Sequence, residues 1–252
     1  MTDTVIQCFL FIIGAIMGSF YNVVSIRTIA GEKFYSGFSS CPNCTSQIKW
    51  FDNIPVISYL FLRGQCRNCK KDISLQYPLV EIITGFAFFA CHSLQYDLIN
   101  YIIFMMIISM LIIISTIDWL EQSIYSIHLL LLAIAIVFFR FSIGVDINPN
   151  LFVGAILMGI FLYLLRLIAG WYYKQEAMGI GDVKLAFVMG LMLDLQGAIV
   201  AMYIAFIVAS LVGVAKLFWN NENERILPFA PFICLGGITS FLFNENIIKF
   251  LF

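Results

Sequence analysis

Residues 98–117 read LINYIIFMMIISMLIIISTI, twenty residues without a charged side chain. A helix of about 20 predominantly apolar residues spans the hydrocarbon core of a bilayer. Similar runs recur along the chain, which is 62% hydrophobic and 12% charged, whereas ordinary soluble domains are about 25% charged. We therefore expect an all-α polytopic membrane protein that resides in the lipid bilayer.

The apolar runs predict seven or eight transmembrane helices. They lie near residues 5–26, 78–96, 98–117, 124–143, 150–170, 182–194, 197–219 and 229–251. The sixth run is short and contains Lys184, which leaves the number of spans open between seven and eight. We divide the chain into a first span at 1–27, a polar insertion at 28–77 and a membrane domain at 78–252.

Basic residues indicate how these helices are oriented. Cytoplasmic loops of membrane proteins carry an excess of lysine and arginine. The first long loop contains half of the 14 basic residues of this chain, namely Arg27, Lys33, Lys49, Arg63, Arg67, Lys70 and Lys71. This bias predicts a cytoplasmic insertion and an N-terminus outside. A net charge of −1 argues against a nucleic-acid partner, because phosphate binding needs a basic surface.

The insertion contains two CxxC motifs, Cys41-Pro-Asn-Cys44 and Cys66-Arg-Asn-Cys69. Two such motifs supply four thiolates, the tetrahedral shell that a structural zinc ion prefers. About fifty residues with little apolar content do not build a core, so metal binding would supply the folding free energy. Two disulfides or a redox dithiol are the alternatives, and a reducing cytoplasm disfavours both.

Two aspartates occur at the predicted cytoplasmic ends of spans, Asp118 in STIDW and Asp182 in MGIGDVK. Ionisable residues in or beside a span are costly and therefore candidates for function. Two carboxylates at similar depth can share one proton, which lets one activate a water molecule while the other polarises a peptide carbonyl. Gly179 and Gly181 would let an extended substrate approach this site closely. An intramembrane aspartic peptidase is the function this pattern favours.

Other interpretations of these carboxylates remain open. Asp118 with Glu121 fits a capping box for the fourth span, and Asp182 can cap the sixth. Intramembrane carboxylates also serve ion- or proton-coupled transporters, and a membrane scaffold would use neither aspartate for chemistry. Glu81 lies deep enough in the second span to need a partner, and Glu176 precedes the GxGD segment.

Taken together, these segments resemble the type IV prepilin peptidase family, whose members are also leader peptidases and N-methyltransferases. The resemblance covers nearly the whole chain. It rests on the motifs Gly18-Ser-Phe-Tyr-Asn22, Cys41-Pro-Asn-Cys44, Trp50-Phe-Asp-Asn-Ile-Pro55, Cys66-Arg-Asn-Cys69, Tyr77-Pro-Leu-Val-Glu81, Asp118, Gly179-Ile-Gly-Asp182-Val-Lys184 and Leu227-Pro-Phe-Ala-Pro231.

The resemblance implies an enzyme of the bacterial inner membrane that removes the leader of prepilins or pseudopilins at the cytoplasmic face. It also implies methylation of the new N-terminal amine with S-adenosylmethionine, and the sequence assigns no residue to that cofactor. Asp118 and Asp182 match the family's catalytic aspartates. The residues expected to support the site are Glu81, Glu176, Gly179, Gly181 and Lys184.

One departure from the family pattern follows the first aspartate. Members of the family usually carry a Pro-Asp pair seven and eight residues after it, where this chain has Tyr125 and Ser126. A proline there would set a turn into the next helix, so its loss bears on loop geometry more than on acid–base chemistry. The oligomeric state has no signature in the sequence.

Overall fold

The computed structural model describes residues 2–33, 35, 37–94, 96–144, 151–174, 178–219 and 227–251. Each of the eight predicted apolar runs forms an α-helix. These helices are α1 (Thr2–Ile29), α3 (Gln76–Cys91), α4 (Leu98–Glu121), α5 (Ser126–Ser142), α6 (Leu151–Tyr173), α7 (Ile180–Gly190), α8 (Leu195–Trp219) and α9 (Ala230–Leu251). The all-α prediction is confirmed, since the described residues form only two isolated β-bridges.

The helices differ in how far they can reach across a bilayer. By length and composition, α1, α4, α6 and α8 can each cross a membrane, whereas α3, α5 and α9 are shorter apolar helices within the described residues. Helix α7 has 11 residues, which is about 16 Å and roughly half the thickness of a hydrocarbon core. The shortness predicted for the sixth run is therefore confirmed.

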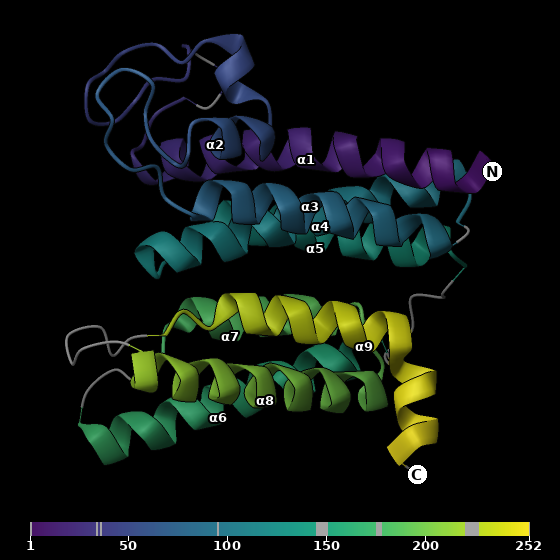
Figure 1. The fold of residues 1–252 in the computed structure, drawn as a ribbon. Coiled ribbons are helices and arrows are strands. Elements are labelled where there is room, and N and C mark those ends of the chain that lie inside the picture. The colour runs from purple at the N-terminus through teal and green to yellow at the C-terminus, as the bar shows by residue number, and fades with distance from the viewer. Residues whose placement is uncertain are drawn as a thin grey trace. The chain divides into compact units, whose positions relative to one another are not determined.

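The chain forms two compact units, residues 1–116 and 117–252. In the first unit, α1 and α3 lie side by side along their lengths (Figure 1). A Cβ at Gly18 would lie 2.8 Å from Cα of Glu81, and one at Gly14 would lie 2.9 Å from Cα of Gly85. Glycines on one face of α1 thus allow the backbones to approach closely, as small residues do between membrane helices.

The second unit is built on similarly close helix pairs. Helix α7 contacts α5, α6 and α9, and α8 contacts α6 and α9. A Cβ at Gly190 of α7 would lie 2.5 Å from Cα of Ala155 on α6, and one at Gly236 of α9 would collide with the backbone of Ala201 on α8. Small residues therefore bring α7 close to α6 and α9 close to α8.

Candidate active site and metal site

Two short loops of the insertion have the same backbone structure. Thr45 N–H donates to Cys41 O at 2.9 Å, and Lys70 N–H donates to Cys66 O at 3.0 Å. Both donors are in the left-handed region, with φ of 56° and 59°. Each first cysteine in turn donates its N–H to the residue five positions later. The insertion therefore contains two knuckles of the same structure. These hydrogen bonds and the left-handed residue recur 25 positions later in the chain.

These knuckles bring four sulfur atoms together. The Sγ atoms of Cys41, Cys44, Cys66 and Cys69 lie within 4.8 Å of one another, with separations of 3.8 Å between Cys41 and Cys69 and 4.0 Å between Cys44 and Cys66. A tetrahedron with zinc–sulfur bonds of about 2.3 Å has edges of about 3.8 Å. The four cysteines can hold a metal ion, and their spacing suits a tetrahedral one.

At two of the four cysteines, Cys44 and Cys66, hydrogen bonds favour the thiolate form that a metal requires. The Ser46 hydroxyl and backbone lower the pKa of Cys44 to about 6. Backbone N–H groups of Cys69 and Asn68 lower the pKa of Cys66. The short helices η1 (Trp50–Asn53) and α2 (Ile57–Phe61) contain no buried residue, so the insertion lacks an apolar core there.

Asp118 lies in the last turn of α4 and is 4% exposed. Its Oδ2 accepts the N–H of Ala230, the first residue of α9, at 3.0 Å, and Phe229 N–H also donates to this carboxyl group. The helix ends at Glu121, and the next residue, Gln122, has a φ of 55°. The first N–H groups of a helix lack partners within the helix, so the start of α9 is a ready donor for a buried carboxylate.

Asp182 lies in the first turn of α7 and is 9% exposed. The N–H of Gly179 donates to its carboxyl group. Its Oδ1 is buried and has no hydrogen-bond partner among the described residues. The two aspartates are close enough to interact electrostatically. The second unit therefore places both predicted carboxylates at one site, where like charges disfavour simultaneous ionisation.

The capping interpretation is wrong for Asp118 and partly right for Asp182. Helix α5 begins after Tyr125 without a side-chain cap, and Asp118 lies inside α4. Glu121 instead accepts the hydroxyls of Ser123 and Tyr125, at 3.1 and 3.0 Å. Asp182 reaches back to the N–H of Gly179, which is the capping residue of α7, as the third residue of a capping box does.

The remaining predicted residues are distributed between the two units. A Cβ on Gly181 would lie 2.9 Å from Ile124 Cβ, so this glycine lets α7 approach the loop after Asp118. Glu81 belongs to the first unit, where it is buried and its Oε2 accepts Val56 N–H at 2.7 Å. It thereby anchors the insertion to α3. Glu176 lies outside the described residues.

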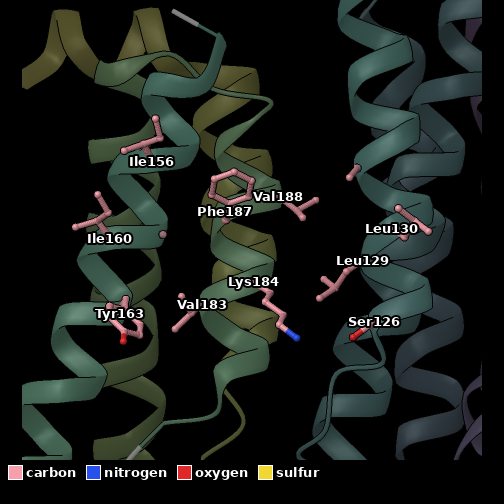
Figure 2. Close-up of a pocket in the computed structure, with 12 residues that line it drawn as sticks. Ser126, Leu129, Leu130, Ile156, Ile160, Tyr163, Val183, Lys184, Phe187 and Val188 are labelled. Carbon is pink, nitrogen blue, oxygen red and sulfur yellow. The ribbon is translucent and has the colours of Figure 1, made fainter. Parts of the chain in front are cut away.

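Lys184 faces an open groove of about 720 Å³ in the second unit. Figure 2 shows its ammonium pointing from α7 toward the side where Ser126 lies on α5. Among the described residues that line the groove, Lys184 carries the one charge. The other lining residues are Ser126, Leu129, Leu130, Ala133, Ile156, Gly159, Ile160, Tyr163, Val183, Phe187 and Val188.

Sequence reasoning gave no role to the backbone donors at the start of α9. The contact between Asp118 and Ala230 joins residues 112 positions apart, so no local pattern predicts it. One signal was available, because Pro231 at the second position of α9 marks a helix start whose N–H groups need acceptors.

Comparison with known proteins gives a consistent answer. The bacterial peptidase A24 N-terminal domain matches residues 12–96, and the type IV leader peptidase family matches residues 105–214. A Bacillus subtilis protein named "Prepilin leader peptidase/N-methyltransferase" is 30% identical over 96% of this chain and 96% of its own length. This chain belongs to the type IV leader peptidase family.

Other members of the leader peptidase family are similarly related. Proteins with the same name from Myxococcus xanthus and Vibrio cholerae are 32% and 30% identical, over 83% and 91% of this chain. The chain spans 62% of the M. xanthus relative and 94% of the V. cholerae one. The N-terminal domain match contains the four cysteines, and the leader peptidase match contains both aspartates. No solved structure matches.

Proposed function

We propose that this chain removes the leader from prepilins or pseudopilins and then N-methylates the new N-terminus. The observation that carries the peptidase is the pairing of Asp118 and Asp182, two buried carboxyl groups from different helices that interact electrostatically. The relatives' shared name supports both activities. Neither the family match nor the relatives' names support the alternative of a transporter.

The unequal surroundings of the two carboxylates support a division of roles. Backbone N–H donors from α9 stabilise the ionised form of Asp118, which suits a base that deprotonates water. Asp182 has an oxygen without a donor, so this carboxyl group would hold the shared proton and donate it toward the scissile carbonyl. Hydrolysis then needs no covalent intermediate.

The protein is a multi-pass protein of the inner membrane, and its orientation follows from charge. Under our proposal the insertion and both aspartates face the cytoplasm, because this placement keeps the basic loop inside. Zinc is the metal that best fits a four-thiolate tetrahedron in a reducing compartment. S-adenosylmethionine would supply an electrophilic methyl group to the amine that cleavage exposes.

Replacing either aspartate with asparagine tests the dyad. Asp118→Asn and Asp182→Asn preserve shape and hydrogen-bond acceptance but cannot titrate. We expect cleavage of a purified prepilin to fall on the order of a thousandfold or more, with metal content and thermal stability retained. Asp194→Asn is the matched control, because Asp194 caps α8 by accepting Gly197 N–H at 2.7 Å.

The control variant should cleave normally, since asparagine is also a good capping residue. Cleavage at near wild-type rate by Asp118→Asn or Asp182→Asn would overturn the dyad mechanism. A loss shared equally by Asp194→Asn would show that the assay reports folding rather than proton transfer.

A further inference from the structure

The short helix α2 of the insertion has one exposed apolar side. Ile57, Leu60 and Phe61 stand at positions i, i+3 and i+4, which lie on the same side of a helix, and all three side chains are exposed. The other side of α2 is tied to the first unit, because the Tyr59 hydroxyl donates to Ile73 O at 3.4 Å, just before α3 begins. The helix is therefore an amphipathic turn whose apolar side the other described residues leave largely uncovered.

Hydrogen bonds fix the level of α2 along the membrane helices. Glu81, in the second turn of α3, accepts the N–H of Val56, the residue at which α2 begins, at 2.7 Å. Gly18 of α1 lies at the same level, because its Cβ would be 2.8 Å from Cα of Glu81. The next charged residue of α1 is Arg27, nine residues further along the helix, which is about 13 Å. This distance exceeds the reach of the glutamate side chain, so α2 starts well below the level of Arg27.

The surface of α1 between these two levels is the kind that contacts lipid. Helix α1 can cross a membrane, and Phe20 and Ile26 are exposed on it. Figure 1 shows α2 level with this end of α1 and α3, not beyond it. A backbone N–H at this level has no water to bond, which explains why buried Glu81 supplies an acceptor to Val56. The apolar side of α2 is therefore continuous in depth with the lipid-facing surface of the first unit.

The charge of the insertion complements a phospholipid surface. Residues 28–77 contain six lysines and arginines and three acidic residues. Arg63 follows α2 by two residues, is exposed, and forms no ion pair within the described part of the chain. Helices that lie in a membrane interface combine an apolar side with cations that attract anionic lipids. Charge complementarity and depth thus favour the same occupant.

We propose that α2 is inserted into the phospholipid leaflet on the insertion's side of the membrane. Ile57, Leu60 and Phe61 occupy the boundary between head groups and acyl chains, and Arg63 meets lipid phosphates. The insertion is then fastened to the bilayer by an interfacial anchor that Glu81 holds at its depth. This anchor is independent of leader cleavage and requires neither aspartate.

Photocrosslinking in the full-length chain, purified without chelator, tests the anchor. The protein is reconstituted into vesicles of phosphatidylethanolamine and phosphatidylglycerol, with a benzophenone analogue of phenylalanine in place of Phe61 or Phe38. Phe38 is the matched control, since it is 79% exposed against 84% for Phe61, and its carbonyl accepts the Arg27 side chain at 3.5 Å. We expect phospholipid adducts at position 61 to exceed those at position 38 about tenfold or more, because burial of a phenylalanine side chain favours lipid over water by at least that factor.

Two variants of Glu81 test what holds α2 at this depth. Glu81→Ala leaves Val56 N–H without its acceptor. We expect this change to lower the adduct yield at position 61 about fivefold or more, as the loss of a partner for a buried N–H does. Glu81→Gln retains a carbonyl oxygen that can accept the same N–H, so it should preserve the yield and serves as the control for removal of the charge.

Three results would overturn the anchor. The first is an equal yield of phospholipid adducts at positions 61 and 38. The second is crosslinking of position 61 to residues 117–252 or to another copy of the chain in place of lipid, which would make protein the occupant of this surface. The third is an adduct yield at position 61 that Glu81→Ala leaves unchanged, because α2 would then not depend on the contact that sets its depth.

Discussion

Gly181→Ala should lower the cleavage rate roughly a hundredfold while the protein still folds. The new Cβ would lie 2.9 Å from Cβ of Ile124 and 3.3 Å from its Cγ1, whereas carbon atoms pack at about 3.5–4.0 Å. Ile124 must therefore move by about 0.6–1 Å. Because this residue belongs to the loop that follows Asp118, the movement should change the relative positions of the two aspartates.

The effects on stability and activity can be separated by magnitude. Overpacking costs about 1–3 kcal/mol, and alanine in place of a helical glycine returns about 0.5–1 kcal/mol. The net loss of stability is therefore about 0–2.5 kcal/mol. A misplacement of about 1 Å in an active site costs roughly a hundredfold in rate. Thermal unfolding and prepilin cleavage would be measured on the same detergent-purified protein.

Gly179→Ala is the matched comparison. Gly179 has φ −68° and ψ 146°, which alanine adopts freely, and its Cβ would meet Asp182 Oδ2 at an ordinary 3.5 Å. We expect cleavage within a few-fold of wild type. Combining Gly181→Ala with Ile124→Gly removes the crowding and should restore most of the activity. Wild-type cleavage by Gly181→Ala, or no rescue by the double variant, would refute the reasoning.

The remaining predictions concern the insertion and the helix packing. Chelation should expose the insertion to proteases with little loss of circular-dichroism helicity, because its two helices have four and five residues; unchanged protease resistance would contradict metal-dependent folding. Arg67 donates to both oxygens of Asp52 and holds the pKa of that carboxyl below its usual range. The ion pair therefore stabilises the folded insertion fully above the ordinary aspartate pKa of about 4. This stabilisation is lost only as the pH falls through the lower pKa that Asp52 has in the folded protein. Asp52→Asn should therefore increase the rate of metal loss to a chelator by the same factor, relative to wild type, at pH 6 and at pH 8. Different factors at the two pH values would contradict this. Gly190→Ala should destabilise by about 1–3 kcal/mol in thermal unfolding, since its Cβ meets backbone at Ala155. Gly213→Ala should be neutral or stabilising, since Leu227 Cδ2, at 3.9 Å, is the one atom of the described residues that the new Cβ would meet within 4 Å.

The lengths of the apolar runs predicted the helices well, because all of these helices are surrounded by the same hydrocarbon layer of the bilayer. It predicted boundaries less well where local geometry decides. The second run was expected to continue to residue 96, but α3 ends at Cys91 and a short 3-10 helix, η2 (His92–Leu94), follows. The metal site was predictable from spacing alone, because two CxxC turns suffice to bring four sulfur atoms together.

The repetition of the knuckle is also visible in the sequence. Cys41-Pro-Asn-Cys44 and Cys66-Arg-Asn-Cys69 share an asparagine, and an isoleucine follows each at the same distance. The candidate active site was only half predictable. The sequence identified the two aspartates, yet the donors to Asp118 lie 112 residues away, and the approach of Gly181 to Ile124 depends on how the helix ends pack.

Helix capping and catalysis are not exclusive roles at this site. The starts of α7 and α9 each present N–H groups that lack partners within the helix, and Asp182 and Asp118 accept them. A carboxylate that serves a helix start in a membrane protein is held rigidly and shielded from water, which an aspartyl dyad also requires. Burial and hydrogen bonding are therefore expected of a structural and of a catalytic aspartate alike. Only the loss of a titrating proton distinguishes them, because asparagine keeps the hydrogen bond to the helix and removes the acid.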